Sequence, residues 1–503
     1  MILSRLLDGV PVTKMFQTMY GQMVTTHEVE IASLQYDSRK VGRDDAFVAI
    51  RGINSDGNNF IPNAIHQGAK VVVTENDVAI ADAFCMHAGV VKVVVPNSRK
   101  TLARMAANFY GTPASKLQLV GVTGTNGKTT TAFLLHALFA RAGLIGTIEY
   151  HVGAEIEDAT HTTPESLELN QLLARMVERN CEAAVMEVSS HSLEQHRIEG
   201  LAFDAAVFTN LTQDHLDYHG TMENYFQAKK NLFDGLGKDS VAVTNIDDPY
   251  GERIIENCKA QVVRYGFDQR AEVCAVDAVL NTSGTTMTVL HREDHTKIDS
   301  SLIGRFNVYN VLAAFAAGIG LGIPKEHIQF AISNVRGVRG RFERINVDAG
   351  WTAIVDYAHT PDALENCMKA VHDIFDSIPL QGKDRGRLIT VFGCGGNRDR
   401  GKRPVMGRIA TELGDITIVT SDNPRFEDPE IILDEIVQGA KAGSVVYREQ
   451  DRRKAIELAS ELARPGDVVL IAGKGHETYQ VVGDQKIPFS DREVLERITA
   501  ASR

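Results

Sequence analysis

The sequence lacks the features that mark membrane, secreted and nucleic-acid-binding proteins. No apolar run approaches the ~18 residues that a membrane helix needs. The N-terminal MILSRLLDGVPV lacks the longer apolar segment and small-residue cleavage site of a secretory signal. The formal net charge of −12 disfavours nucleic acid or an anionic membrane as the main partner, while leaving room for a local basic cleft. We expect a cytoplasmic protein that binds neither membrane nor nucleic acid.

Cysteine is also scarce. The six cysteines, at positions 85, 181, 258, 274, 367 and 394, form no C-x-x-C pair. This spacing argues against a zinc site and against a disulfide framework. We therefore expect buried, reduced thiols.

The length and the turn signals predict three domains. The 503 residues exceed what one core usually organises, and division by ~150 residues gives about three domains. One boundary is expected after Tyr110-Gly-Thr-Pro113, and another in the glycine- and arginine-rich stretch 336–343. The predicted domains are residues 1–113, 114–338 and 339–503.

Strand and helix patterns predict an α/β fold. Apolar runs at 69–74 and 90–95 indicate strands in a small N-terminal α/β domain. In the last domain, helical patterns such as 451–463 alternate with short β-rich runs. These runs are 352–356, 388–392, 415–420 and 467–472. The alternation predicts a mostly parallel sheet of Rossmann type.

The most informative stretch, LQLVGVTGTNGKTTT at 117–131, predicts a strand that feeds a phosphate-binding loop. Glycines at 121, 124 and 127 are expected to let the backbone approach phosphate oxygens. Lys128 supplies charge for the β- and γ-phosphates, and the hydroxyl of Thr129 or Thr130 can ligate Mg²⁺. The predicted nucleotide-binding residues of the loop are Gly124, Thr125, Asn126, Gly127, Lys128, Thr129 and Thr130.

The apolar run 131–143 that follows predicts a helix that ends at Gly143, and the N-terminus of this helix also favours an anion. Val122 stands where the usual loop pattern has its first glycine, which implies a tighter loop. The alternative is a glycine turn that binds nothing.

An acid and a histidine are expected near this loop. Glu187 ends the strand-like run CEAAVMEV, and His215 follows the strand-like run FDAAVFTNL. Ligands of parallel sheets gather at the carboxyl ends of strands, so we predict that both residues end neighbouring strands and hold Mg²⁺. The alternative for each is a satisfied polar residue without a ligand.

A helix is predicted at 222–233, with Lys229 on the same face as Tyr225, Phe226, Leu232 and Phe233, and with Lys230 off that face. An inward lysine is costly unless it is paired or modified. The pattern alone favours a lysine that reaches the surface.

Eight motifs occur together in this chain. They are GTNGKTT at 124–130, EVSSH at 187–191, NLTQDHLDYH at 210–219, YFQAK at 225–229, DYAHTPD at 356–362, GCGGNRDRGKRP at 393–404, DNPR at 422–425 and GKGHE at 473–477. In this order, over nearly the whole chain, the set resembles the Mur ligase family. Asn397 departs from the pattern, because relatives often carry an acidic residue there.

The resemblance implies an N-terminal domain for the UDP end of UDP-N-acetylmuramoyl-L-alanyl-D-glutamate, a central ATPase domain and a C-terminal domain that brings an amino acid. It implies that Lys229 is a carbamate that helps to hold a second Mg²⁺, beside the catalytic Lys128, Glu187 and His215. Further nucleotide positions are Asn310, Arg341 and Asp356. Positions near the muramyl peptide are Thr162, Thr163, Ser189, Gln195 and Arg197, and Ser38 lies near uridine.

The expected reaction is ATP-dependent amide formation. The γ-phosphoryl group passes to the substrate's terminal carboxylate, and an amine then attacks the acyl phosphate. Mg²⁺ and Lys128 stabilise charge on the transferring group. Because water would hydrolyse the intermediate, we expect domain closure.

The amino acid is expected to be meso-2,6-diaminopimelate, because Arg425 can bind its distal carboxylate through two hydrogen bonds and would repel the bare ammonium of lysine. The resemblance places the other contacts at Arg398, Asp422, Asn423, Pro424, Gly473 and Glu477. The alternative for Asp422-Asn-Pro is a turn that holds Arg425.

Two rival functions remain open at this point. One is a nucleotide-gated regulatory protein, which explains the phosphate loop but leaves the C-terminal motifs without a role. The other is a ligase like folylpolyglutamate synthetase, which does not need the N-terminal 113 residues or the DNPR motif. For the Mur ligase interpretation we expect a monomer with small-molecule substrates.

Overall fold

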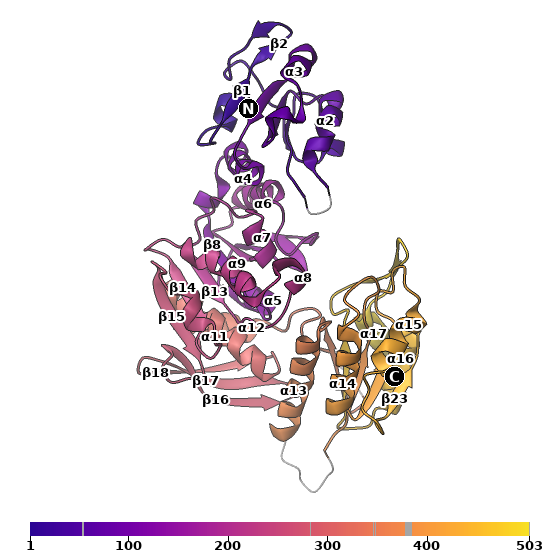
Figure 1. The fold of residues 1–503 in the computed structure, drawn as a ribbon. Coiled ribbons are helices and arrows are strands. Elements are labelled where there is room, and N and C mark those ends of the chain that lie inside the picture. Colours follow the sequence, from indigo (N-terminus) through magenta and orange to yellow (C-terminus); the bar gives the residue numbers. More distant parts are fainter. Residues whose placement is uncertain (53–54, 282, 346, 348, 378–384, 502–503) are drawn as a thin grey trace.

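The computed structural model describes residues 1–52, 55–281, 283–345, 347, 349–377 and 385–501 (Figure 1). Three α/β bodies follow one another along the chain, with the C-terminal body beside the central one. In these ranges, no helix combines the length and apolarity that crossing a membrane requires. All six cysteines are unpaired, and Cys258 is half-buried while the other five are buried, so the expectation of buried thiols is wrong for Cys258 alone.

The N-terminal body is a small sheet in the order β1-β7-β6-β5-β4, parallel except for β1. Its valine-rich central strands are buried on both faces, as in parallel sheets covered by helices. The predicted strands at 69–74 and 90–95 are β6 and β7, each slightly shorter. The elements are α1 (Leu3–Leu6), β1 (Lys14–Phe16), β2 (Thr18–Met19), β3 (Gln22–Met23), β4 (Leu34–Gln35), η1 (Ser38–Lys40), β5 (Ala46–Val48), η2 (Gly57–Phe60), α2 (Ile61–Gln67), β6 (Val71–Thr74), η3 (Asp77–Ala79), α3 (Asp82–Ala88), β7 (Val91–Val94), α4 (Ser98–Phe109) and η4 (Pro113–Lys116).

The central body has a long sheet in the order β11-β10-β9-β12-β8-β13-β14-β15-β16-β17-β18. In this spatial order, the seven strands β9-β12-β8-β13-β14-β15-β16 are parallel. Antiparallel strands extend the sheet at both ends, β10 and β11 at one and β17 and β18 at the other. Its elements are β8 (Gln118–Thr123), α5 (Lys128–His136), β9 (Ala142–Ile145), β10 (Glu149–Val152), β11 (Glu155–Asp158), α6 (Ser166–Glu178), β12 (Ala183–Glu187), α7 (Ser190–Glu194), β13 (Ala205–Phe208), α8 (Leu216–His219), α9 (Met222–Asp234), β14 (Val241–Asn245), α10 (Gly251–Ile254), β15 (Gln261–Gly266), β16 (Val273–Asn281), β17 (Gly284–His291), β18 (Asp294–Ser300), α11 (Arg305–Gly320) and α12 (Lys325–Asn334).

The C-terminal body has the order β19-β20-β24-β21-β22-β23, parallel except for β19, with a separate β25-β26 hairpin. The parallel sheet predicted from the sequence is confirmed. Its elements are β19 (Glu343–Ile345), β20 (Thr352–Asp356), α13 (Pro361–Ser377), β21 (Leu388–Phe392), α14 (Lys402–Leu413), β22 (Ile416–Val419), α15 (Pro429–Val437), β23 (Val446–Arg448), α16 (Arg452–Leu462), β24 (Val468–Ala472), β25 (Tyr479–Val482), β26 (Gln485–Pro488) and α17 (Asp491–Ala501).

Two local predictions in the central domain are wrong. The helix after the phosphate loop, α5, ends at His136, and Gly143 lies in strand β9 instead. Pairing of β9 with β12 outweighs the helical spacing there, and a Cβ at Gly143 would lie 2.2 Å from Sδ of Met176. Gly121 lies within β8 and not in the loop, where a Cβ would meet the ring of Phe203 at 3.0 Å. Gly143 therefore lets α6 pack on the sheet, and Gly121 makes room for the Phe203 ring, which lies just before β13.

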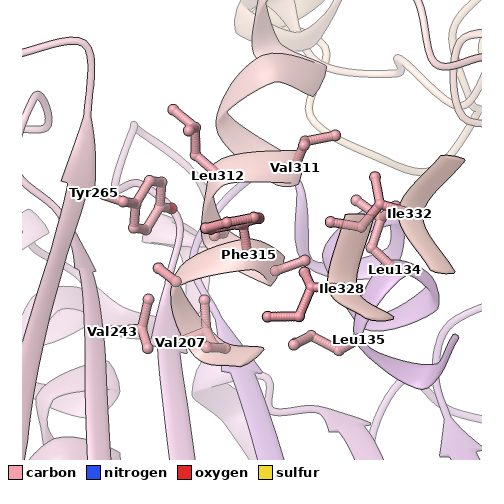
Figure 2. Close-up of a cluster of buried hydrophobic side chains, with 14 of the residues drawn as sticks. Leu134, Leu135, Val207, Val243, Tyr265, Val311, Leu312, Phe315, Ile328 and Ile332 are labelled. Atoms are coloured by element: carbon pink, nitrogen blue, oxygen red, sulfur yellow. The ribbon is translucent and has the colours of Figure 1, made fainter. Parts of the chain in front are cut away.

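One of two cores of the central body lies between the sheet and helices α5, α11 and α12 (Figure 2), and the other includes residues of α6, α7 and α9. Helix α11 is apolar nearly all round, as expected for a helix covered on all sides. Its Phe315 is 1% exposed and lies among side chains of the sheet and the neighbouring helices. This core includes Val120 and Val122 of β8, and so it holds the strand that leads into the phosphate loop.

Phe315→Ala is expected to destabilise the central domain by about 3–5 kcal/mol, because it removes a buried ring and leaves a cavity. In a domain of this size, that loss lowers the midpoint of its thermal transition by roughly 10 °C. Differential scanning calorimetry measures the shift. Phe330→Ala on α12 is the control, since Phe330 is 69% exposed. Equal shifts in the two variants would contradict this description of the core.

Candidate active site

The phosphate loop, residues 124–127, links β8 to α5 and needs glycine at two positions. Gly124 has φ +149°, and a Cβ there would lie 1.9 Å from Oγ1 of Thr209. Gly127 has φ +85°, and a Cβ there would lie 2.4 Å from Oδ1 of Asn310. Asn310, on α11, is therefore packed against the loop. The loop can turn this tightly only because neither position carries a side chain.

Lys128 opens helix α5 and folds back over the loop. Its Nζ donates to the carbonyl oxygens of Gly124 at 2.9 Å and Thr125 at 2.8 Å. Burial lowers the pKa of Lys128, while the charges of Glu187 and Asp214 oppose that shift. The ammonium therefore lies at the N-terminus of a helix, where the dipole also favours an anion.

Glu187, at the end of β12, is buried beside the loop. It accepts hydrogen bonds from Oγ1 of Thr129 at 3.1 Å and from the amide and hydroxyl of Thr147 at 2.7 and 3.0 Å. A carboxylate and a hydroxyl are the oxygen ligands that Mg²⁺ prefers, with phosphates and water completing the shell. Thr147 was not predicted, and no motif of the sequence marks it.

Lys229 is 1% exposed on α9, so the surface position that the pattern alone favours is wrong. Its Nζ donates to the same Gly124 carbonyl at 2.9 Å and lies 4.6 Å from the centre of the Tyr225 ring. Burial, and then the charge of Lys128, lower the pKa of Lys229 well below its usual value. Lys230 is also buried, contrary to prediction, because it bonds to Asp234 and to the carbonyl of Glu256 at 2.7 Å.

His215 and Glu187 do not end neighbouring strands. Strands β12 and β13 flank β8, so the two residues approach the loop from opposite sides. His215 precedes α8 with φ +54°, and its Nε2 lies 3.5 Å from Asp214. Within the described ranges, no three His, Cys, Asp or Glu side chains gather around one point that could hold a metal ion. Glu187 bonds to Thr129 on one side of the loop, and His215 lies on the other, where burial and the nearby charges of Lys128 and Lys229 lower its pKa. We call Glu187 with Thr129, and His215 with Lys229, the two half-sites.

Five of the residues predicted near the muramyl peptide form one cluster beside Glu187. Thr163 donates to the Glu187 carbonyl at 2.8 Å, and Thr162 lies 3.1 Å from Thr147. The remaining contacts are those of Ser189 with Thr163, of Arg197 with Thr163 and Gln195, and of Gln195 with Tyr218.

Ser38 lies apart from that cluster, in the N-terminal domain, where it accepts a hydrogen bond from Asn63 at 3.2 Å. The contacts that join the two domains nearby include Tyr36 with Glu168 at 3.0 Å and Arg99 with Glu165 at 2.9 Å. A ligand that touched both Ser38 and the central cluster would therefore span this domain boundary.

The C-terminal domain reaches the phosphate loop through Asp362 on α13. Oδ2 of Asp362 accepts from Nδ2 of Asn126 and from the Thr212 hydroxyl, each at 3.0 Å. Asp356 accepts the amides of residues 342 and 358, and the Arg341 guanidinium lies 4.9 Å from the centre of the Tyr357 ring. Asp362 belongs to the DYAHTPD motif, which was the available signal for this contact.

A cleft of about 1170 Å³ separates the loop after β13 from the C-terminal domain. Its wall includes His215 from the central domain, opposite Arg398, Arg425 and Glu477. Asp422, Asn423 and Gly473 also line it, whereas Pro424 is buried outside the lining. The residues predicted around the amino acid are thus brought together, apart from Pro424.

Lys474 was not predicted, although it lies in the GKGHE motif. It is fully buried, and its Nζ donates to Asn423 at 3.1 Å and to Glu477 at 2.9 Å, with Asp422 at 3.4 Å. Asn423 also donates to Oε2 of Glu477 at 3.0 Å. These contacts fix the floor of the cleft, and Oε2 of Glu477 is already bonded there.

The fold and the site define a class: a three-domain α/β protein whose phosphate loop faces a Rossmann-like domain across a cleft. Three Mur ligase family models match the chain. They are the "Mur ligase family, catalytic domain" at residues 30–110, the "Mur ligase middle domain" at 122–318 and the "Mur ligase, glutamate ligase domain" at 340–475.

Similar proteins agree with these matches over nearly the full length. A UDP-N-acetylmuramoyl-L-alanyl-D-glutamate--2,6-diaminopimelate ligase of Gloeobacter violaceus is 47% identical, over 93% of each chain. One of Parabacteroides distasonis is 44% identical, over 93% of this chain and 95% of the relative. A solved structure of such a ligase is 32% identical, with TM-score 0.68, and covers 97% and 99% of the two chains. The chain belongs to the Mur ligase family, and its activity is that of an ATP-dependent amide ligase.

Lys128→Ala is expected to lower turnover at least about 10²-fold, because the ammonium stabilises charge on the phosphoryl group in a buried site. A phosphate-release assay measures this loss, and a circular dichroism melt checks that the fold is retained. Lys116→Ala is the control, since Lys116 is exposed just before β8. Activity above about a tenth of the parent's would remove Lys128 from the catalytic role.

Proposed function

We propose that the protein joins meso-2,6-diaminopimelate to UDP-N-acetylmuramoyl-L-alanyl-D-glutamate at the expense of ATP. The observation that carries this proposal is the cleft in which Arg398, Arg425 and Glu477 face the loop after β13, beside the phosphate loop. An amino acid with a distal carboxylate and two amines matches two guanidinium groups and a carboxylate. The similar ligases named above carry this activity in their names.

The proposed reaction has two steps. An oxygen of the glutamate carboxylate attacks the γ-phosphorus of ATP, the bond to the bridging oxygen breaks, and ADP leaves. The amine of diaminopimelate then attacks the carbonyl carbon of the acyl phosphate, loses a proton, and inorganic phosphate leaves. Lys128 is placed to stabilise charge on the transferring group through its ammonium.

We assign the two half-sites beside Lys128 to Mg²⁺. Thr129 and Glu187 would hold one ion, and His215 with a carbamate on Lys229 would hold a second. Bound Mg²⁺ supplies charge neutralisation on the phosphates. The buried oxygen donors around Glu187 fit this ion, and Asn310, Arg341 and Asp356 are the proposed nucleotide contacts outside the loop.

The carbamate on Lys229 is proposed because two lysines share one carbonyl acceptor in a buried place. A depressed pKa favours the neutral amine, whose nitrogen can attack carbon dioxide and release a proton. The product is an anion, which removes the repulsion between Lys229 and Lys128. It also provides oxygen ligands where the amine provides none.

The other proposed contacts follow the same geometry. Thr162, Thr163, Ser189, Gln195 and Arg197 are assigned to the muramyl peptide, and Ser38 to the uridine end.

We take residues 1–113, 114–338 and 339–503 as the working limits of the three domains. The protein is proposed to act in the cytoplasm, where ATP is available, and as a monomer.

Phosphate release from ATP tests the proposal, measured with the UDP-muramyl dipeptide, with and without diaminopimelate. The proposed ligase releases phosphate in proportion to amide formed only when both substrates are present. A regulatory protein would show no dependence on diaminopimelate. A ligase of the folylpolyglutamate synthetase kind would not use the UDP-muramyl dipeptide.

Arg425→Ala is expected to reduce the preference for diaminopimelate over lysine. The parent protein should prefer diaminopimelate at least about 10³-fold in kcat/KM, because an unpaired guanidinium and carboxylate cost several kcal/mol when buried. Competition between the two amino acids, with product mass as readout, gives the ratio. Arg408→Ala, at an exposed position of α14, is the control. Comparable use of lysine by the parent would refute the substrate while leaving the ligase reaction intact.

Lys229→Ala is expected to abolish turnover and to regain part of it when a short carboxylate such as formate or acetate is added. The added anion can stand where the carbamate stood. Phosphate release over a range of carboxylate concentrations measures the rescue. Lys230→Ala is the matched control, because Lys230 is the neighbouring buried lysine and bonds away from the loop. Absence of rescue, together with equal damage at Lys230, would contradict the carbamate.

A further inference from the structure

A buried arginine lies beneath the two loops that carry the cleft arginines. Arg403, in the first turn of α14, is 0% exposed. Its Nη2 donates to the carbonyl of Gly395 at 3.2 Å, and its Nη1 donates to Glu427 at 2.9 Å and to Glu435 at 2.6 Å. Gly395 belongs to the loop of Arg398, and Glu427 to the loop of Arg425. One guanidinium therefore holds both loops.

Further hydrogen bonds join the two loops directly. The other oxygen of Glu427 accepts the amide of Asn397, and Oδ1 of Asn397 accepts the amide of Phe426 at 3.1 Å. The Gly396 amide donates to the Asn423 carbonyl at 2.9 Å. Asn397 thus acts as a hydrogen-bonding bridge between the loops.

The backbone conformations next to the cleft depend on these bonds. Asn397 has φ +52° and Arg425 has φ +53°, in the left-handed region that side chains other than glycine rarely occupy. The backbone of Arg425 is held on its other side by the β25-β26 hairpin, through Val481 at 3.0 Å and Gly483 at 2.8 Å. Such conformations persist where the surroundings over-determine them, and they gather at ligand sites.

Stability alone does not account for Arg403. A buried ion pair is weak evidence for stability, because apolar residues of similar volume often do as well. Nε of Arg403 is buried without a hydrogen-bond partner among the described residues, which adds a further cost. Glu435 has a second partner, the exposed Arg400, so its charge does not require Arg403.

We propose that Arg403 is a positioning residue for the amino-acid site, which sets the spacing of Arg398 and Arg425 through Glu427 and Asn397. This inference rests on the proposed function of the cleft. A ligand with two carboxylates at a fixed separation is selected by the spacing of the groups that bind them, and a shift of about 1 Å can cost about 10²-fold in rate. Arg403 touches no substrate itself.

The test compares Arg403→Met, Glu427→Ala, Glu427→Gln and Asn397→Ala with the parent protein. Arg400→Ala is the matched control, because Arg400 pairs with the same Glu435 from the surface. Initial rates give kcat and the KM values for diaminopimelate, ATP and the UDP-muramyl dipeptide. Competition gives the ratio of diaminopimelate to lysine incorporation, and thermal melts report the fold.

The expected result is a rise of at least about 10-fold in KM for diaminopimelate, with a lower preference over lysine, in Arg403→Met and Glu427→Ala. KM for ATP should stay within about twofold, as in Arg400→Ala. Glu427→Gln should recover part of the loss, because its side chain keeps one acceptor. If Arg403→Met does not fold, Glu427→Ala and Asn397→Ala decide the question, since both positions reach the surface.

Folded Glu427→Ala and Asn397→Ala with unchanged KM and unchanged preference would overturn the inference. So would losses that fall equally on ATP, or equal damage in Arg400→Ala. These outcomes differ from failure of the proposed function, in which the parent protein itself does not use diaminopimelate. If the parent uses lysine instead, the same KM comparison is made with lysine and tests Arg403 in the same way.

Discussion

The carbonyl oxygen of Gly124 accepts hydrogen bonds from two lysines, the half-buried Lys128 and the buried Lys229. Burial is the main reason that the pKa of each lysine is lowered, and the charge of Lys128 lowers the pKa of Lys229 further. Anions relieve both penalties. A nucleotide phosphate can offset the charge of Lys128, and a carbamate can offset the charge at Lys229. The unfavourable placing of two lysines at one carbonyl therefore favours anionic ligands at the loop. Glu187 and Asp214 supply only part of the compensation.

The phosphate loop, with Lys128 and Lys229 beside it, is connected to the cleft through Asp362. Its carboxylate bonds to Asn126 of the phosphate loop and to Thr212, on the segment that continues into the cleft wall at His215. A carboxylate next to a phosphate site is repelled once the phosphate arrives. Phosphate in the loop would therefore weaken this contact, which is one of several between the central and C-terminal domains. Such coupling suits a reaction whose acyl phosphate must be kept from water.

Local chemical signals are sufficient to predict the phosphate loop and the parallel sheets, because glycine, lysine and strand patterns are short-range features. The residues around the cleft, apart from Arg425, are expected only from the resemblance of the motifs to the Mur ligase family. The local signals do not predict the strand order. Glu187 and His215 are therefore expected on neighbouring strands, whereas β8 lies between β12 and β13 in the structure. The predicted helix runs past the end of α5, since Gly143 packs under Met176 only after β9 pairs with β12. Periodicity alone favours a surface position for Lys229. It gives no sign that Lys128 and Lys229 donate to the same carbonyl oxygen inside the protein. Thr147, Asp362 and Arg403 depend on contacts between distant segments.

In the C-terminal domain, the residues that face the cleft differ from the buried residues that hold them in place, such as Arg403. The groups that face the cleft, Arg398 and Arg425, lie on loops, and loops by themselves hold a side chain less accurately than helices or strands do. The hairpin β25-β26 fixes Arg425 from one side, and the helix-borne Arg403 fixes both loops from beneath. Lys474 does the same for Asn423 and Glu477 on the floor. On the proposal made for Arg403, selection of the amino acid depends on buried cations that do not contact it. This would account for ion pairs that contribute little to stability and yet lie under this cleft.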